Sequence, residues 1–442
     1  MDIRPTMSAF TPQVYNNTNA EQTMAAPVAD KQPEESFISS ANGSVNLIVT
    51  NDDKAKLEEM RSAILAKNPE NKVTAELPLI NGFAVTVNPS EDGSIMPVLS
   101  KSVSETGSMF LDAQIGIPGE AQIGIPGDEL QEVENTFRPL MDNANVTLGV
   151  DKLHEQGITG KGTTICVIDT GIAQHPDFEG RIIGFQDMVN GRTEAYDDQG
   201  HGTHCAGICA GSGKTSEGKY TGVAPEANLV GVKVLDGRGS GSLSNVIKGV
   251  QWAVENKEKF GIDVISMSLG GYVSQSYKTD PVVQAVEAAY DAGISCVIAA
   301  GNEGPSSGTI GSPGNAPDAI TVGALDDKGT PDRSDDSLAY FSSRGPSRID
   351  KLEKPDILAP GVNITATAHK GNGYVSMSGT SMATPFAAGV DALMHQVKPD
   401  ITPAQAKEVM MKFADPLQNV DKFQQGKGVI DPQENIEYLM GK

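Results

Sequence analysis

The residue with the clearest chemical potential is Ser381, which lies in a Gly-Thr-Ser stretch before an apolar, alanine-rich run at 386–394. This pattern predicts a serine in the first turn of a buried helix, where backbone N–H groups lack helical partners and favour negative charge. A serine there can attack a carbonyl carbon, and the same N–H groups can hold the oxyanion that forms. The alternative is a plain Ser/Thr helix cap, which is commoner for an isolated stretch of this kind.

Three further stretches offer groups that would assist such a serine. Asp169 ends an apolar run at 165–168 before a Thr-Gly turn, and His201 stands between glycines at the start of a small-residue helix. A carboxylate can orient a histidine, and the histidine can take the proton of the serine. The order Asp169, His201, Ser381 is the one found in subtilisin, in contrast to two unrelated folds. Asn302 follows the apolar run 296–298, where its side-chain amide can donate to an oxyanion.

These four stretches resemble the subtilisin-like serine proteases, the subtilases, and the resemblance covers residues 143–435. Within that family the chain is most similar to the AprX-type intracellular bacterial proteases, on the stretches 177–185, 225–229, 341–346 and 354–361. The alternative is a chance occurrence of four polar residues at strand ends. Four long and specific stretches in the right order make that alternative a poor explanation.

The resemblance implies a substrate cleft between two glycine-rich edges. A substrate peptide is expected to bind as an added β-strand between these edges, because main-chain hydrogen bonds form with any amino-acid sequence. Small residues would line the pocket for the side chain before the scissile bond (P1), which predicts a preference for large apolar P1 residues. The cleft residues assigned in this way are Ser240, Gly241, Ser242, Leu243, Ser268, Leu269, Gly270, Gly271, Ala299, Ala300, Gly301 and Gly311. Plain glycine-rich turns are the alternative for these loops.

The elements that must position these residues follow an alternating pattern. Strand-like runs at 163–168, 228–234, 263–267, 294–299 and 319–322 alternate with helical patterns at 201–210, 242–257, 281–292 and 381–397, and a last helix is expected at 403–413. Such alternation is typical of βαβ units. The sequence therefore predicts an α/β catalytic domain at 143–442, with a parallel sheet and helices on both faces.

A smaller domain is predicted before it. Residues 1–43 are polar and are expected to form a disordered leader. Residues 44–111 show a strand at 45–49, a helix at 54–67, strands at 73–79 and 82–87, a poor helix near 95–99 and a strand at 109–111, a small α+β unit. Placed before a subtilisin-like domain, this unit resembles the family's propeptide, a chaperone and intramolecular inhibitor. An unrelated ferredoxin-like module is the alternative.

Residues 112–142 are predicted to be a linker that contains a duplication. The heptapeptide Ala-Gln-Ile-Gly-Ile-Pro-Gly occurs at 113–119 and again at 121–127. Glycine and proline exclude a regular helix there, and two copies are too few for a repeat fold. Its apolar residues could line the substrate cleft or the propeptide interface. Maturation would cut between 105 and 141, with Phe110, Leu111, Phe137, Leu140 and Met141 as apolar P1 candidates.

Composition narrows the partners and the compartment. The formal net charge of −23 argues against nucleic acid and against an anionic membrane surface, which both need a basic footprint. The sequence has no apolar run long enough to cross a membrane. Its start does not have the pattern of a secretory signal, and its four cysteines lie in apolar or helical stretches typical of buried free thiols. We therefore expect a cytoplasmic protein, or a secreted one if a signal has been removed.

Metal sites are the least specific prediction. An acidic loop with Asp326, Asp327, Asp332, Asp335 and Asp336 has the oxygen density that suits structural Ca²⁺, and a solvated turn is an equal alternative. Asp177 matches a calcium ligand of the family, although the Asn-rich loop that completes that site is missing from 212–220. Zinc at the His/Cys positions 201, 204, 205 and 209 is disfavoured, because the two histidines are only three residues apart. A phosphate loop at 211–215 is rejected, because its first glycine is replaced by Ile208.

The sequence as a whole predicts a serine endopeptidase that cuts polypeptides through an acyl-enzyme and is made as a self-processing precursor. Its own propeptide would be its inhibitor, and no organic cofactor is expected. The alternative is a latent or catalytically silent member of the family that acts as a peptide-binding scaffold. The complete set of Asp169, His201, Asn302 and Ser381 speaks against that alternative.

Overall fold

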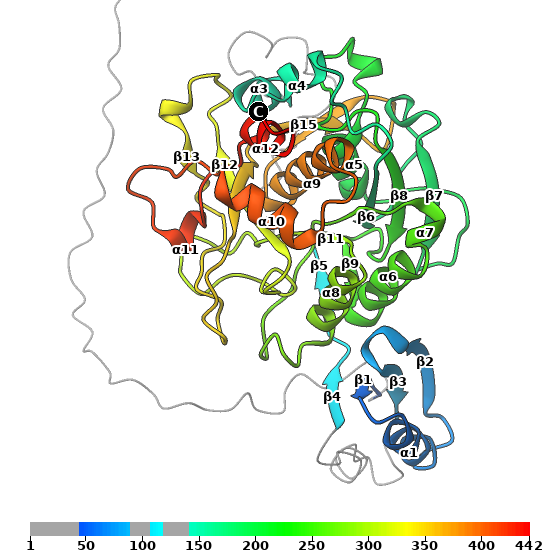
Figure 1. The fold of residues 1–442 in the computed structure, drawn as a ribbon. Helices are drawn as coiled ribbons and strands as arrows, with labels where there is room; N and C mark the ends of the chain where they lie inside the picture. Colours follow the sequence, from blue (N-terminus) through cyan, green and yellow to red (C-terminus); the bar gives the residue numbers. More distant parts are fainter. Residues whose placement is uncertain (1–43, 89–106, 118–140) are drawn as a thin grey trace, which may run out of the picture.

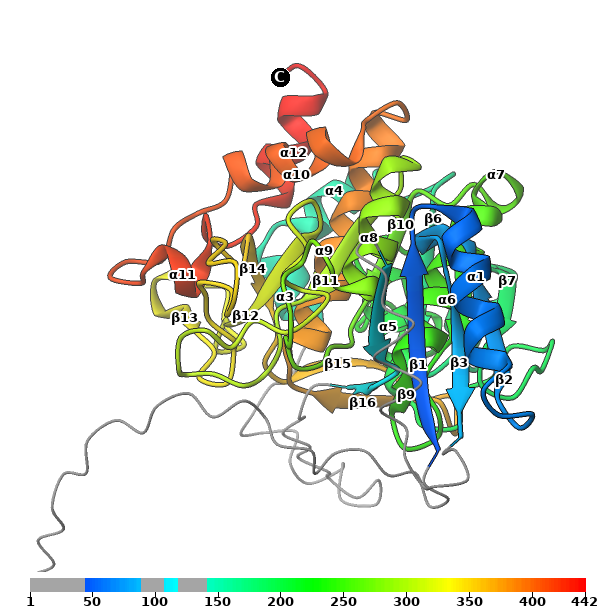
Figure 2. The same cartoon turned by 90° about the horizontal axis from the view of Figure 1, so that it is seen from below.

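The structure, a computed structural model, describes residues 44–88, 107–117 and 141–442 (Figure 1). The expected leader, the helix near 95–99 and the second heptapeptide lie outside these ranges. In the described part, a small N-terminal α+β unit lies against a larger α/β unit (Figures 1 and 2). None of the described helices combines the length and hydropathy needed to span a bilayer.

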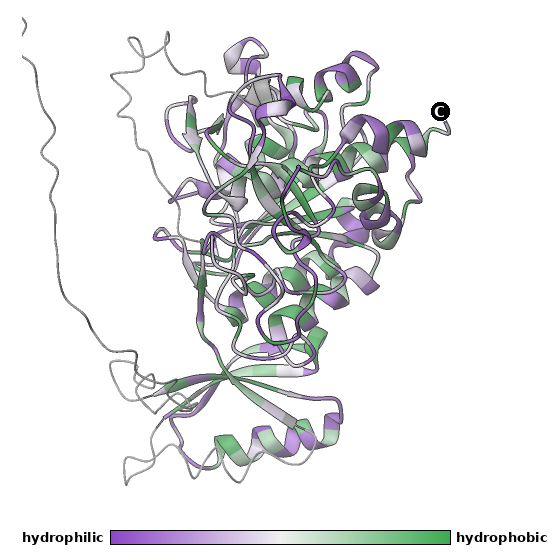
Figure 3. Ribbon diagram, turned by 90° about the vertical axis from the view of Figure 1, so that its left-hand side faces the viewer, coloured by the Kyte–Doolittle hydropathy of each residue, from purple (hydrophilic) through white to green (hydrophobic). Residues whose placement is uncertain are grey.

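The N-terminal unit is a four-stranded antiparallel sheet in the order β2-β3-β1-β4, with one helix on its outer face (Figure 3). Its elements are β1 (Val45–Asn51), α1 (Lys54–Leu65), β2 (Lys72–Leu77), β3 (Gly82–Val87) and β4 (Gly107–Leu111). Helix α1 begins where Asp53 caps the backbone N–H groups of Ala55 and Lys56. The predicted α+β character of this region is confirmed.

The larger unit is built on an eight-stranded sheet whose hydrogen-bonded path runs β13-β12-β11-β10-β6-β8-β7, with β14 beside β12. Only β13 is antiparallel to its neighbour. The strands are β6 (Thr164–Asp169), β7 (Ile182–Asp187), β8 (Asn228–Lys233), β10 (Val264–Met267), β11 (Ser295–Ala299), β12 (Ile320–Asp326), β13 (Ser337–Leu338) and β14 (Ile357–Pro360). Short two-stranded pairs join β5 (Gln114–Gly116) to β9 (Ser240–Ser242) and β15 (Ile364–Thr367) to β16 (Tyr374–Met377).

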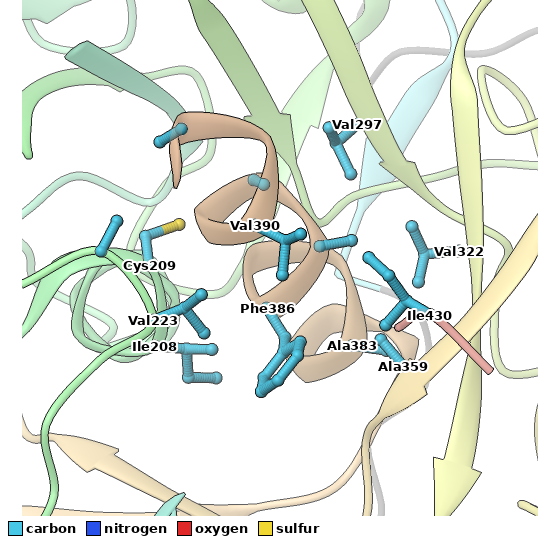
Figure 4. Close-up of a cluster of buried hydrophobic side chains, with 14 of the residues drawn as sticks. Ile208, Cys209, Val223, Val297, Val322, Ala359, Ala383, Phe386, Val390 and Ile430 are labelled. Atoms are coloured by element: carbon cyan, nitrogen blue, oxygen red, sulfur yellow. The ribbon is translucent and has the colours of Figure 1, made fainter. Parts of the chain in front are cut away.

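Helices cover both faces of this sheet, so the predicted α/β class is confirmed. The described α-helices of this unit are α3 (Met141–Thr147), α4 (Val150–Glu155), α5 (His201–Ala210), α6 (Leu243–Glu255), α7 (Lys257–Phe260), α8 (Pro281–Asp291), α9 (Thr380–Val397), α10 (Pro403–Lys412), α11 (Lys422–Gln425) and α12 (Pro432–Leu439). Helix α9 is buried along its length, and its residues Phe386 and Val390 pack between α5 and the strands (Figure 4). Because strands β6, β10 and β11 are wholly buried, their apolar sequences are continuous rather than alternating.

Candidate active site

Asp169 and His201 meet at the carboxyl end of the sheet. Asp169 is the last residue of β6, His201 is the first residue of α5, and the His201 Nδ1 atom lies 2.7 Å from Asp169 Oδ1. Both side chains are fully buried. Helix α5 comes this close to β6 because Gly202 has no side chain: a Cβ there would lie 2.2 Å from the carbonyl oxygen of Gly171.

The electrostatics of this pair stabilise the positive charge that the His201 ring gains when it accepts a proton. Burial alone would lower the pKa of His201, but the negative charge of Asp169, the Cys205 thiol and the hydrogen bonds raise it well above its ordinary value. Asp169 Oδ1 also accepts a hydrogen bond from the backbone N–H of Thr170, at 2.7 Å. The carboxylate is therefore held in place, and it stabilises the positive charge that His201 would gain by taking a proton.

Ser381 is the second residue of α9, and its hydroxyl oxygen is buried without a hydrogen-bond partner among the described residues. Its carbonyl oxygen would normally accept from the N–H four residues on, but that residue is Pro385, which has none. Two other elements supply donors instead. Ser268 Oγ, after β10, donates at 2.9 Å, and Cys205 Sγ, on α5, lies at 3.4 Å.

The side chain of Asn302 is oriented by the residue before the serine. Asn302 Oδ1 accepts hydrogen bonds from the backbone N–H and the hydroxyl of Thr380, both at 2.9 Å. The amide nitrogen must then point the other way. A Cβ built on Gly379 would lie 3.1 Å from Asn302 Nδ2 and 3.5 Å from the backbone nitrogen of Ser381, so both donors border the same small space. This is the arrangement that an oxyanion needs.

The thiol of Cys205 is a close neighbour of the histidine. Its sulfur lies 3.9 Å from His201 Nδ1 and 4.0 Å from Nε2, and burial raises the pKa of this thiol. Among the described residues, Asp169, His201 and Cys205 form the one group of three or more potential ligands whose ligand atoms converge. His204 does not belong to it, because its Nε2 atom contacts the carbonyl oxygens of Ile364 and Val375, as expected of a core histidine.

The predicted cleft residues gather beside this site. Gly271 and Ser312 exchange backbone hydrogen bonds of 2.8 and 2.9 Å, and the Gly311 N–H donates to the carbonyl oxygen of Ala300 at 3.1 Å. A Cβ on Gly311 would lie 3.1 Å from the carbonyl oxygen of Gly271. Ala299 and Ala300 are buried, and Gly301 has a φ of 109°, which favours glycine. The structure therefore brings the expected walls of the P1 pocket together.

A strand from the expected linker lies between the two predicted edges of the cleft. Strand β5 pairs antiparallel with β9, with Gln114 opposite Ser242 and Gly116 opposite Ser240. On its other side Gly116 exchanges hydrogen bonds with Gly270, at 2.9 and 3.3 Å. Both edges named from the sequence thus hold one extended segment of the chain itself.

Side chains next to this strand fix it further. Ile115 is only 2% exposed and belongs to the apolar cluster that Leu243 and Ile117 also contact. The carboxylate of Asp112 accepts from the backbone N–H and the hydroxyl of Ser244, at 2.8 and 2.6 Å, in the first turn of α6. A carboxylate at that end of a helix is favoured by the helix dipole.

The described residues do not fit the predicted calcium sites in this arrangement. Asp177 already accepts four hydrogen bonds, from the backbone of Gly213, the backbone and hydroxyl of Thr215, and the hydroxyl of Tyr374. The five aspartates of the acidic loop each have their own local partner and do not converge; those partners are, in chain order, Lys328, Gly329, Ser334, Thr330 and Arg333. The calcium prediction gains no support here and stays a prediction.

Sequence reasoning missed two contributors to the site. Thr380 was read only as part of the serine loop, although its hydroxyl and N–H orient Asn302. The other is the strand conformation of β5: its heptapeptide was predicted to be a linker whose apolar residues could line the cleft, but no strand was predicted there. The isoleucines at 115 and 117 were the available signal, because an apolar side chain on every second residue is typical of a strand.

Comparison with known proteins agrees with this geometry. A model of the subtilase family matches residues 160–428. Serine protease AprX of Bacillus subtilis (strain 168) is 42% identical over 398 residues, which cover 86% of this chain and 84% of that protein. Subtilisin DY of Bacillus licheniformis is 38% identical over 284 residues, covering 64% of this chain and 93% of that protein. Subtilisin E of Bacillus subtilis (strain 168) is 41% identical over 286 residues, covering 64% of this chain and 67% of that protein. The resemblance seen in the sequence is confirmed, and the chain belongs to the subtilase family as a subtilisin-like serine peptidase.

Proposed function

We propose that this serine endopeptidase works through Ser381, His201, Asp169 and Asn302. Ser381 Oγ attacks the scissile carbonyl carbon while His201 takes its proton and later gives it to the leaving amine. Asp169 holds the histidine tautomer and stabilises the imidazolium. Asn302 Nδ2 and the Ser381 backbone N–H hold the oxyanion. Hydrolysis of the acyl-enzyme by water, with the same histidine as base, returns Ser381 to its starting state.

The observation that carries the proposal for substrate binding is the placement of β5. A polypeptide substrate would take the same antiparallel position between β9 and Gly270, since those backbone groups are the ones that β5 engages. Main-chain pairing makes the specificity broad. The P1 pocket, with Ala299, Ala300, Gly301 and Gly311 as small walls, would accept a large apolar side chain.

We also propose that residues 44–117 act as an intramolecular inhibitor in a self-processing precursor. The N-terminal sheet packs on α6 and α8 through Ile48, Leu77, Ile80 and Ala84, and β5 fills the cleft. Substrate could not enter until this segment leaves. Of the apolar cleavage candidates, Phe110 and Leu111 are paired with β1, so a cut there requires β4 to open. Phe137, Leu140 and Met141 follow β5 in the chain.

Intact mass over time, for the wild type beside Ser381→Ala, tests this proposal. Loss of an N-terminal fragment ending between 105 and 141 in the wild type alone is expected for a self-processing precursor. If neither chain is cut but the wild type hydrolyses a peptide with a large apolar P1 residue, the propeptide role is wrong. If neither cutting nor hydrolysis occurs, the latent or scaffold alternative replaces the active precursor. The cytoplasmic location stays a prediction.

A further inference from the structure

The contacts of the first heptapeptide show that the duplicated unit includes the acidic residue before it. Asp112, which binds the first turn of α6, directly precedes the first copy, and Glu120 directly precedes the second. Each copy is therefore an eight-residue unit that begins with an acidic residue: the first unit is 112–119 and the second is 120–127. The difference between the units is one methylene group, in the acidic side chain.

Every contact of the first unit with the cleft uses a feature that the second unit also has. The acid accepts from Ser244. The carbonyl oxygen of Ala113 accepts from the Leu243 N–H at 3.1 Å, and the Ile117 N–H donates to the carbonyl oxygen of Gly239 at 3.1 Å. The buried side chain is Ile115. Moving the chain by eight residues would present Glu120, Ala121, Ile123 and Ile125 to the same partners.

The exchange would draw on the chain before and after the second unit. Residues 112–119 would form a loop between β4 and the second unit, and loop closure becomes only slowly less favourable with length. Thirteen residues, 128–140, would still connect the second unit to α3, and they span roughly 45 Å when extended.

We propose that the two units are alternative occupants of one cleft, so that the second unit, 120–127, takes the place of the first whenever the first leaves. This inference rests on the proposed inhibitory role of the segment. Its consequence concerns activation. A single hydrolysis between the units would release the N-terminal domain but leave the second unit attached to the catalytic domain. The enzyme would become fully active only after a further cut beyond 127.

The test uses the full-length active chain with an aspartate in place of the buried isoleucine of either unit or of both. The variants are Ile115→Asp, Ile123→Asp and the double substitution, and Ile349→Asp is the control because Ile349 is an isoleucine on the exposed surface. Initial rates on a P1-Phe peptide are measured in the first minutes, with intact mass recorded on the same samples to exclude processed chains.

We expect both single variants and the control to be as slow as the wild type, and the double variant to be at least about tenfold faster. A tethered unit has an effective concentration on the order of millimolar, so it fills the cleft even when its affinity is modest. A rate for Ile115→Asp equal to that of the double variant would overturn the exchange while leaving the inhibitory role intact. A double variant as slow as the wild type would overturn the inhibitory role itself.

Hydrogen exchange gives a readout that does not depend on activity. In a Ser381→Ala chain, the backbone amides of Leu243 and Gly270, which donate to the carbonyl oxygens of Ala113 and Gly116, should stay protected with Ile115→Asp, because the second unit covers them. They should exchange faster in the double variant. Equal exposure in the two variants would show that the second unit does not reach the cleft.

Discussion

The two sheets of this molecule bury their faces in different ways. Both faces of the parallel catalytic sheet are covered by helices of its own unit, with α5 and α9 on one face and α6 and α8 on the other (Figure 2). The N-terminal sheet covers one face with α1, through Leu57, Met60 and Ile64. Its other face lies against α6 and α8. The N-terminal unit thus depends on the catalytic unit for part of its core, whereas the catalytic sheet does not need the N-terminal unit to cover it.

The largest expected effect is that of Asn302→Ala, which tests whether catalysis in the catalytic unit can be lost while the unit stays folded. Asn302→Ala should lower kcat by roughly 10²–10³, since losing an oxyanion donor of this kind costs about 2.7–4 kcal/mol, a range known from a subtilisin. The melting temperature should fall by only a few degrees, because the structural cost is confined to the Thr380 N–H and hydroxyl, which lose Asn302 Oδ1 as their acceptor. Ser381→Ala sets the floor of activity. An unchanged kcat would remove Asn302 from the oxyanion site.

The next prediction uses two neighbouring residues that face the two sides of the N-terminal sheet. Leu47 packs in the unit's own cluster, and Ile48 packs in the cluster shared with α6 and α8. Each change to alanine should cost about 2–5 kcal/mol. Leu47→Ala should lower the melting temperature of the N-terminal unit, whereas Ile48→Ala should mainly weaken its docking. In a Ser381→Ala chain, calorimetry and limited proteolysis distinguish these results, and identical behaviour of both variants would contradict the comparison.

A smaller effect concerns the pH dependence of docking. Burial raises the pKa of Asp112, an effect that the hydrogen bonds from Ser244 only partly offset. The docked state therefore holds a proton more tightly than the released state, so docking should strengthen as pH falls through the raised pKa and weaken as pH rises through it. One proton gives at most about a tenfold change per pH unit. Asp112→Asn should flatten this dependence, measured as the initial rate of unprocessed chain against pH. An equally steep profile in the variant would exclude Asp112 as the group responsible.

The smallest expected effect is that of metal removal. Because the aspartates of the acidic loop do not converge in this structure, we expect EDTA to leave the melting temperature of the Ser381→Ala chain unchanged. Within the loop, burial raises the pKa of Asp327 to about 6. A fall in melting temperature that added CaCl₂ reverses would support the calcium prediction.

Much of the fold could be predicted from the sequence, for physical reasons that differ between elements. Strands β6 and β11 were evident because a strand buried on both faces has a continuous apolar sequence. Strand β7 was missed because it is only partly buried and its sequence mixes glycine and polar residues with apolar ones. Strand β14 has only four residues and ends in a proline, so it gave no pattern long enough to recognise.

The candidate site also contains residues that could be predicted from the sequence and features that could not. Asp169, His201 and Ser381 could be located because each stands at the end of a strand or the start of a helix with a recognisable sequence. The cleft was one of two locations considered for the first heptapeptide, but the pairing of β5 with β9 could not be predicted, because its partners lie more than 120 residues away and only tertiary contacts select them. The shared site expected of the acidic loop stays a prediction, since the density of aspartates in a sequence does not reveal where their carboxylates point, and in this structure they do not converge.

Pro385 has a consequence for the dynamics of the reactive serine. The first turn of a helix is where hydrogen bonds ordinarily open and close most often. Here the carbonyl oxygen of Ser381 is held by Ser268 and Cys205, which belong to the segment after β10 and to α5. Fraying of α9 therefore cannot displace the serine unless these tertiary contacts also break. The missing N–H of one proline thereby couples the position of the nucleophile to the helix that carries its base.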